Sequence, residues 1–446
     1  MDTSRSLVAL GLVAGLGATP LAGQPIPAPA GEVALGGDTL DRTALIQAVL
    51  ERNPGIAAAR QAWEAAREQI PQARSLDDPM ARYGVAPLSI ASGDVPFGHQ
   101  LEVAQRLPYP GTLRLRGEIA AAEAAAAEQE IEEVRLRLAT MASLLFDDYY
   151  AVGRALAINA EHLRLLEGFR QVATGRYAAG LAPQQAPIQA EVEAAHLLHA
   201  EVVLESDRRT LTAQLNALLH RPPRAPLPPP PDDPGPLPTE DTAEAPALAL
   251  ASARPELAAQ RAEIAARRTA VALEKLDFHP DFEVMASYNS MWGMTEHQWM
   301  VEVGINLPIR RQRVRAAVAA AEARLASAES ELARLEDAVR AEVEVAAEEL
   351  REALHVVHLY RNRVLPAARD QIAAARAGFE TGAVSMLDLI EAERSLRTSE
   401  LNHDQALAEA FSRRAELDRA LGRLPFAAPA PVTPAPTASD PTETER

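Results

Sequence analysis

Histidines stand at helical spacing in two places and could chelate a metal ion, because residues three apart lie on one face of a helix. Neither pair has a third ligand or supporting partner in the sequence, so we expect solvated helix surfaces. The motif Met291-Trp292-x-Met294 could bind copper through its Met side chains. We prefer the interpretation that it belongs to a loop at the membrane rim or outside the cell. No metal or cofactor is predicted. The histidine pairs are His196 with His199 and His355 with His358.

Catalytic motifs are absent from the sequence. It contains no Gly-rich phosphate loop, nucleophile elbow or HExxH motif. It contains no Cys, which excludes thiolate nucleophiles, thiolate zinc sites, disulfides and an N-terminal lipid-modified Cys. Acidic residues are abundant but dispersed, so the sequence singles out no pair of carboxylates that could act as a catalytic acid and base. The sequence therefore predicts a protein that is not an enzyme.

The composition favours long helices. Of 446 residues, 48% are hydrophobic but only 4% are aromatic. Ala contributes more to the apolar count than any other residue, and Ala has the highest helix propensity and lets helices approach closely. A net charge of −18 argues against a nucleic-acid partner, which would need a basic face.

The N-terminal residues have the order of a secretory signal. Arg5 precedes an apolar run from Leu7 to Leu16, and small residues follow at Ala22 and Gly23. We therefore predict an export signal. No later stretch reaches ~18 consecutive apolar residues, so no transmembrane helix is expected. An exported chain without such an anchor is either soluble or inserts in a membrane as a β-barrel.

The chain carries an internal duplication. Four anchors recur with a nearly constant spacing of 200–202 residues, and chance similarity among Ala-rich helices would not keep this register. The matching positions are Pro54 and Pro255, Pro79 and Pro280, Leu107-Pro108 and Leu307-Pro308, and Gly180 and Gly382.

Each repeat has the same order of predicted elements. A first helix (39–73 or 244–276) precedes a strand region (79–109 or 281–309), a very long helix (113–178 or 313–380) and a last helix (186–219 or 386–421). Pro366 should kink or locally reset the second long helix. The predicted segments are a signal peptide at 1–23, a first repeat at 24–220, a Pro-rich extended connector at 221–243, a second repeat at 244–422 and a disordered Pro-rich tail at 423–446.

The strand regions alternate apolar and polar residues. In 282–289 and 298–306 one face carries aromatic and branched residues and the other carries polar ones; 79–89 and 98–107 repeat the pattern more weakly. Standing alone, such hairpins favour a small soluble sheet. If they span a membrane instead, four strands leave unpaired edges, so the chain must oligomerise. Three protomers would supply twelve strands.

Ordered motifs surround the long helices in both repeats. Together they resemble the TolC-like outer-membrane efflux family over about residues 40–422. Those motifs are Leu107-Pro108-Tyr109-Pro110-Gly111-Thr112 and Leu307-Pro308-Ile309 before the long helices, Gly175-Arg176-Tyr177-x-x-Gly180-Leu181 and Gly378-Phe379-x-x-Gly382 at their ends, and Leu387-Asp388-Leu389-Ile390-Glu391-Ala392 beyond.

The resemblance implies a fold that is mainly α with β. The duplicated unit of long coiled-coil helices and two two-stranded segments would trimerise into a twelve-stranded transmembrane β-barrel on a twelve-helix α-barrel. This homotrimer would sit in outer-membrane lipid and extend into the periplasm. It would be the passive exit duct of a tripartite export system, fed by an inner-membrane pump through a periplasmic adaptor.

The resemblance also assigns site residues. The helical breaks would be tips that dock the adaptor, and acidic residues just beyond the second tip, Asp388 and Glu391, would form a ring at the duct entrance. The equivalent positions in the first repeat are Ala186 and Gln189. Closed family members link helices through a Tyr and an Arg near this tip, where this chain has Phe379 and Val384. The expected docking residues are Tyr177, Gly180, Leu181, Phe379, Gly382 and Val384.

The sequence leaves the substrate open. Metal cations, drugs and secreted proteins use similar ducts, and the acidic balance favours cations. The alternative function is a soluble periplasmic coiled-coil adaptor or scaffold, which explains the helices and the signal. It does not explain the duplicated amphipathic strands.

Overall fold

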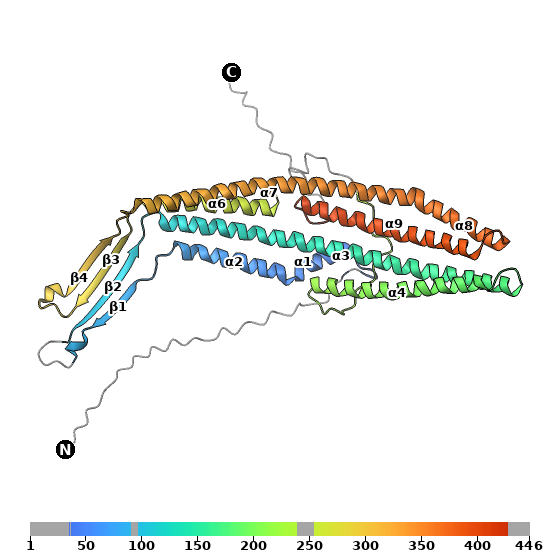
Figure 1. Ribbon diagram of the computed structural model, residues 1–446. Helices are drawn as coiled ribbons and strands as arrows, with labels where there is room; N and C mark the ends of the chain where they lie inside the picture. Colours follow the sequence, from blue (N-terminus) through green and yellow to red (C-terminus); the bar gives the residue numbers. More distant parts are fainter. Residues whose placement is uncertain (1–34, 36, 91–96, 239–253, 427–446) are drawn as a thin grey trace, which may run out of the picture. The chain divides into compact units, whose positions relative to one another are not determined.

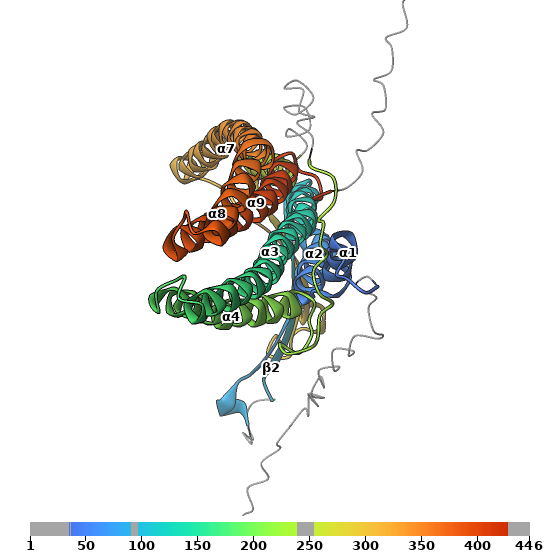
Figure 2. The same ribbon diagram turned by 90° about the vertical axis from the view of Figure 1, so that its right-hand side faces the viewer.

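The computed structural model describes residues 35, 37–90, 97–238 and 254–426. These residues belong to a single unit that spans 34–446. The predicted signal peptide, residues 91–96 between the two strands of the first repeat, the end of the connector and most of the predicted tail lie outside the described residues. In Figures 1 and 2 the long helices of the unit run side by side, and the strands lie at one end of them.

The first repeat contains helices α1 (Arg42–Arg52), α2 (Pro54–Arg74), α3 (Thr112–Ala178) and α4 (Gln185–Leu218). Where the sequence predicted one helix over 39–73, the structure has two. Asn53 is extended at the break, as expected for a residue before Pro. Its side chain accepts a 2.9 Å hydrogen bond from the N–H of Gly55 and so caps α2.

The second repeat contains α6 (Pro255–Leu276), α7 (Arg311–Leu359), α8 (Leu365–Thr381) and α9 (Met386–Ala420). A π-helical turn, Tyr360–Val364, separates α7 from α8. Pro366 lies in the first turn of α8 and cannot donate a backbone hydrogen bond. The long helix is therefore reset just before Pro366, as the sequence predicted.

The two repeats share details at the start of α2 and α6. The Asn53 amide donates to the Leu218 carbonyl at 2.9 Å, and the Arg254 guanidinium donates to the Ala420 carbonyl at 3.5 Å. After α4 and α9 the chain turns with positive φ, at His220 (52°) and Gly422 (72°). Equivalent contacts thus close the short helix onto the last helix in both halves.

The strands form one four-stranded antiparallel sheet in the order β1-β2-β3-β4. They are β1 (Met80–Val85), β2 (His99–Leu107), β3 (Phe282–Asn289) and β4 (Trp299–Ile305). The first strand ends earlier than the predicted 79–89, because Pro87 opens a 3₁₀ turn, η1 (Pro87–Ser89); a second such turn, η2 (Thr295–His297), precedes β4. β2 pairs with β3, so the two repeats are joined edge to edge.

Register gives this sheet one apolar and one polar face. Tyr83, Leu101, Tyr288 and Trp299 are paired across all four strands, and two residues along the strands Ala81, Val103, Ala286 and Val301 are paired in the same way. The opposite face carries an Arg82–Glu102 ion pair, Ser287, Glu283 and Glu302. The predicted alternation is therefore present.

Apolar side chains between the helices hold the two repeats together. One cluster joins α6, α7 and α9 within the second repeat through Leu257, Leu350 and Leu417, and another joins both repeats through Leu166 of α3 and Leu389 of α9. The long helix α3 packs against α4 of its own repeat and also against α6 and α9 of the other. Within the described ranges, every helix falls short of the apolar length needed to cross a membrane.

The described part of the Pro-rich connector runs in an extended form along α3. The Pro228 carbonyl accepts from the Tyr149 hydroxyl at 3.2 Å, and the Pro229 carbonyl accepts from the N–H of Leu40 at 2.8 Å. Pro230 packs so closely on Gly153 that a Cβ there would lie 2.3 Å from the Pro ring. The connector is thus fixed to the helices by its backbone carbonyls.

Candidate docking and gating site at the helical tips

Each long helix pair ends in a tip where the chain reverses. We define the first tip as residues 177–183 and the second tip as residues 379–385. Gly180 and Gly382 adopt left-handed φ values of 72° and 83°, which favour Gly. The N–H of the following residue donates back to the last helical turn, from Leu181 to Arg176 and from Ala383 to Gly378, each at 2.8 Å. Both reversals are therefore Gly-terminated helix ends of the same kind.

The second tip ends in a capping box that starts α9. The Ser385 hydroxyl accepts from the N–H of Asp388 at 3.3 Å, while Asp388 accepts from the Ser385 N–H at 3.0 Å and from its hydroxyl at 2.6 Å. Val384 lies directly over Gly378, where an added Cβ would come within 2.4 Å of the Val384 side chain. The conformation of the second tip is thus set by side chains on both sides of the turn.

A shared core lies behind both tips. Phe379 on α8 is only 5% exposed and packs with buried residues of three surrounding helices. That cluster contains Leu166, Phe169 and Ala173 from α3, Ala186, Ala190 and Leu197 from α4, and Met386, Leu389 and Ile390 from α9. In the single chain, Phe379 therefore supports the tips from within.

Arg176 connects the first tip to the second. Its guanidinium donates to the Glu380 carbonyl at 2.7 Å and to the Leu181 carbonyl at 3.5 Å. It also lies over the Phe379 ring, 5.4 Å from the ring centre. The two carbonyls come from different repeats, so one side chain links both reversals.

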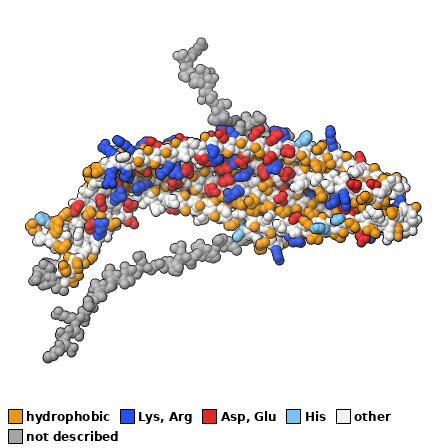
Figure 3. Space-filling model, viewed as in Figure 1, with side chains coloured by type: hydrophobic (Ala, Val, Ile, Leu, Met, Phe, Trp, Pro, Cys, Tyr) orange, Lys and Arg blue, Asp and Glu red, His pale blue; other side chains and the backbone are white. Residues whose placement is uncertain are grey.

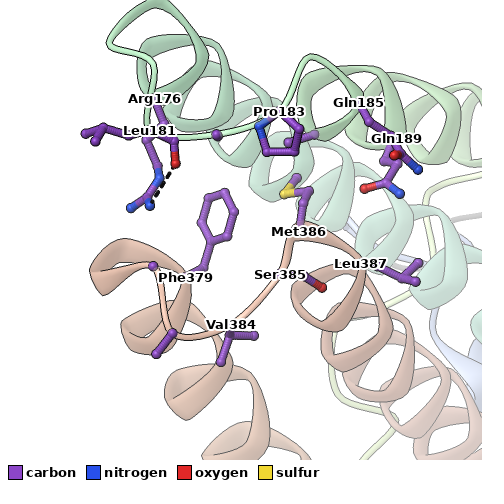
Figure 4. Close-up of a pocket in the computed structure, with 14 residues that line it drawn as sticks. Arg176, Leu181, Pro183, Gln185, Gln189, Phe379, Val384, Ser385, Met386 and Leu387 are labelled. Atoms are coloured by element: carbon purple, nitrogen blue, oxygen red, sulfur yellow. Dashed lines mark hydrogen bonds between the residues drawn. The ribbon is translucent and has the colours of Figure 1, made fainter.

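A groove opens between the tips (Figure 4). Its volume is about 480 Å³. Arg176 and Phe379 lie at one end of the labelled residues, and Gln185, Gln189 and Leu387 lie at the other. The lining combines apolar side chains with amide and hydroxyl groups, and it comes from both repeats. Such a surface suits the end of another helical protein better than it suits a small charged ligand.

The predicted acidic residues lie on the exposed side of α9. Asp388 and Glu391 are both exposed and stand three residues apart, and they therefore share a helix face. Hydrogen bonds from the Ser385 hydroxyl and N–H lower the pKa of Asp388, which keeps this carboxylate charged. In the first repeat, Ala186 is buried and Gln189 lines the groove.

The predicted docking residues fall into two groups. Tyr177, Gly180, Leu181 and Gly382 are exposed at the tips, whereas Phe379 is buried and Val384 is half-buried over Gly378. The sequence did not single out Arg176 as a link, although it stands in the quoted motif before the first break. A long basic side chain one turn before a helix end was the available signal.

A buried ionic cluster lies further along the same helices. The ring of His162 on α3 is 1% exposed; its Nδ1 is 2.7 Å from Glu393 and its Nε2 is 3.0 Å from Glu400, both on α9. Both ring nitrogens face carboxylates, so the ring must carry both protons. Burial opposes this charge, but the hydrogen bonds that the ring donates to both glutamates outweigh it and raise the pKa of His162 to about 9.

A second buried carboxylate lies near this cluster. Glu193 on α4 is paired with Arg394 and, at 3.9 Å, with Arg397, both on α9. Arg369 on α8 approaches Glu400 at 3.7 Å. All three pairs join α9 to another helix, and the two pairs made by Glu193 join the first repeat to the second. The charges therefore fix how the repeats meet behind the tips.

The histidine pairs of the sequence are exposed on helix surfaces. This holds for His196, His199, His355 and His358. In the part of the chain that the structure describes, no three His, Asp or Glu residues are grouped so that they could hold a metal ion.

The chain is similar to known proteins in its second half and in its fold. Residues 246–423 match the family model for outer membrane efflux proteins. No curated protein matches the chain in sequence. Among solved structures, the outer membrane protein VceC of Vibrio cholerae aligns at 20% identity with a TM-score of 0.71, over 86% of this chain and 96% of VceC.

Two further structures are similar over most of their length. A membrane protein from Pseudomonas aeruginosa aligns at 21% identity with a TM-score of 0.73, over 90% of this chain and 96% of that one. The open state of the MtrE outer membrane channel of Neisseria gonorrhoeae aligns at 20% identity with a TM-score of 0.68, covering 86% and 89%. The likeness extends over both repeats and not only over the half that the family model matches.

Proposed function

We propose that the protein is the exit duct of a tripartite export system, because residues 246–423 match the family model for outer membrane efflux proteins and the chain has the fold of solved outer membrane proteins. It conducts passively. An inner-membrane pump and a periplasmic adaptor deliver the substrate, and the duct carries it across the outer membrane.

The exposed apolar face of the sheet is the observation that carries this proposal. Trp299 and Val301 on β4 are 69% and 75% exposed, and Val303, Ile305, Leu101 and Val103 on the same face are exposed as well. Single exposed apolar residues are common, but a continuous face of a sheet is not. Lipid covers such a face, while the polar face with Arg82 and Glu102 lines a watery interior.

Two features support self-association. In the described chain the outer edges of β1 and β4 have no partner strand, and free edges do not persist in lipid. The exposed side of α4 carries an apolar stripe, which consists of Ile188, Val192, Leu198, Val202 and Val203. Three copies of the chain would close their sheets into twelve strands and pack their helices side by side.

The tips face the periplasm in this arrangement and dock the adaptor. The groove between them offers an apolar floor with Gln185, Gln189 and Ser385 at its sides, and Tyr177 and Leu181 project beside it. A helical hairpin of the adaptor fits this chemistry. The direct docking residues are then Tyr177, Leu181 and Val384, while Phe379 and both glycines maintain the shape.

Asp388 and Glu391 form a cation-attracting ring at the entrance of the duct. We expect Asp388→Asn with Glu391→Gln to raise the concentration of a multivalent cation needed for half-block roughly tenfold, because six carboxylates of the trimer are lost. Block is measured on single channels in planar bilayers. Glu201→Gln with Asp207→Asn, a matched loss of exposed charge on α4, should leave block unchanged. Equal block in the wild type and the ring variant would remove these residues from the entrance.

Metal cations are the substrate class that the acidic ring and the net charge of −18 favour. The selectivity of the whole system resides mainly in the pump. A metal-type or drug-type pump encoded beside this chain would decide between the two classes.

The alternative, a soluble periplasmic adaptor or scaffold, is tested by fractionation. The duct remains in the outer-membrane fraction after an alkaline wash and elutes from detergent as particles of three chains. A protein found only in the wash-soluble periplasmic fraction would exclude the duct and leave the scaffold.

A further inference from the structure

Arginines concentrate where the strands give way to the long helices. Residues 310–315 contain four Arg and no acidic residue, in a chain whose net charge is −18. The first repeat has two Arg at the corresponding start of α3. We call this set the basic collar: Arg114 and Arg116 with Arg310, Arg311, Arg313 and Arg315, all of them exposed.

Helix stability does not explain this placement. The N-terminus of a helix carries partial positive charge, so carboxylates are favoured there and arginines are not. Neither α3 nor α7 has an acidic residue in its first turn. The arginines therefore stand where the helix itself disfavours them.

Ion pairs explain it only in part. Arg114 pairs with Glu118 on its own helix, and Arg313 approaches Asp277 at 3.9 Å. Arg310, Arg311 and Arg315 make no ion pair with any residue in the described ranges. Three guanidinium groups are thus available to a ligand.

The collar borders a polar cavity of about 420 Å³. Its lining includes Arg310 and Arg313 at the start of α7 and Asp277 and His279 just after α6. Asp281 is already occupied, since it accepts from Arg106 at 2.7 Å and from the N–H of Tyr109 at 3.0 Å. Among the described residues, Arg310 is the guanidinium lining this cavity that has no ion-pair partner, since Arg106 pairs with Asp281 and Arg313 approaches Asp277.

The collar also continues the exposed apolar face. Beyond Ile305, Leu307 and Ile309 are exposed, Ile309 to 84%, and Arg310 follows at once. Figure 3 shows hydrophobic side chains over the strands and Lys and Arg side chains gathered where the strands meet the helices. Apolar surface followed by basic side chains matches the boundary between acyl chains and phosphate groups.

We propose that the basic collar binds the phosphates of anionic phospholipids in the periplasm-facing leaflet of the outer membrane and so fixes the depth of the sheet. The inference rests on the proposed function. A membrane surface is favoured over a free anion because the guanidinium groups are spread along two helix starts beside apolar surface. Bidentate contacts from Arg suit phosphate oxygens.

The test measures binding of phosphatidylglycerol to the trimer in detergent, by the rise of its unfolding midpoint as this lipid is titrated into the micelles. We expect Arg310→Gln with Arg311→Gln and Arg315→Gln to weaken apparent binding at least about tenfold. Phosphatidylcholine should have little effect on either protein. The control combines Arg324→Gln, Arg361→Gln and Arg363→Gln, which removes three exposed arginines of the same long helix, none of them in an ion pair with a described residue.

Retention of phosphatidylglycerol binding in the collar variant, or an equal loss in the control, would overturn the proposal. So would an equal stabilisation by inorganic phosphate, which would indicate a free-anion site. The duct is assessed separately on the same variant. A collar variant that still forms trimers and conducts in bilayers, while it has lost the lipid preference, supports the collar. A wild type that binds the lipid but never conducts contradicts the duct alone.

Discussion

Replacement of His162 is expected to cause the largest loss of stability of any single substitution among the charged residues behind the tips. His162→Ala removes the cation between Glu393, which is fully buried, and Glu400. One oxygen of Glu393 already has no hydrogen-bond partner. Breaking a buried pair in this way costs about 3–5 kcal/mol. The unfolding midpoint of the detergent-purified protein, followed by circular dichroism, should fall by several degrees.

The same cluster predicts a pH dependence of defined sign. Since the folded pKa of His162 is raised to about 9, against ~6.5 for an unfolded His, its contribution is complete below pH ~6.5 and is lost as pH rises through 9. The midpoint difference between the wild type and His162→Gln should therefore be largest at low pH and shrink above pH 9. His196→Gln, at an exposed position, is the control. A difference that stays constant from pH 6 to 10 would show that the ring is not charged.

Replacement of Arg176 is expected to change the duct rather than the stability of the chain. Arg176→Ala removes the hydrogen bonds to Glu380 and Leu181 and frees the two tips from each other. We expect the loss of these hydrogen bonds, which a charged donor makes at a partly exposed site, to reduce the free energy that keeps the tips linked by about 1–2 kcal/mol. This shifts the balance between linked and separated tips roughly fivefold to thirtyfold. Single-channel recording should show a larger or longer-lived open conductance.

Arg170→Ala provides the matched control for Arg176. Arg170 lies two turns earlier on α3, and its ion-pair partner Glu167 is on the same helix. Its loss should leave conductance unchanged. If Arg176→Ala conducts like the wild type and like Arg170→Ala, the link between the tips does not gate the duct.

The sequence predicted the fold class, and the structure and comparisons confirm it. Helical periodicity, the Pro and Gly breaks and the alternation in 282–289 are local signals, and they gave the order of helices and strands. As the resemblance to the TolC-like efflux family predicted, residues 246–423 match the family model for outer membrane efflux proteins, and the solved structures show the same fold over both repeats. The boundaries of the predicted segments remain predictions, and two of the segments lie largely outside the described residues.

Long-range contacts could not be predicted from the sequence. The break at Asn53 has a local cause in Pro54, although one continuous helix was predicted there. Arg176 reaches a carbonyl 204 residues away, and His162 reaches carboxylates 231 and 238 residues away. Residue types and spacing along one helix do not reveal such partners. Phe379 likewise looked like a tip residue, and only the packing of four helices shows that it is buried.

Bilayer recording of the purified wild-type protein tests the central claim most directly. Three chains that join their sheets with the apolar face outward should insert into planar membranes and produce discrete conductance steps with a preference for cations. Protein that is recovered from the membrane as a trimer but gives no steps above the bare bilayer would contradict the account, because the polar face would then enclose no continuous path.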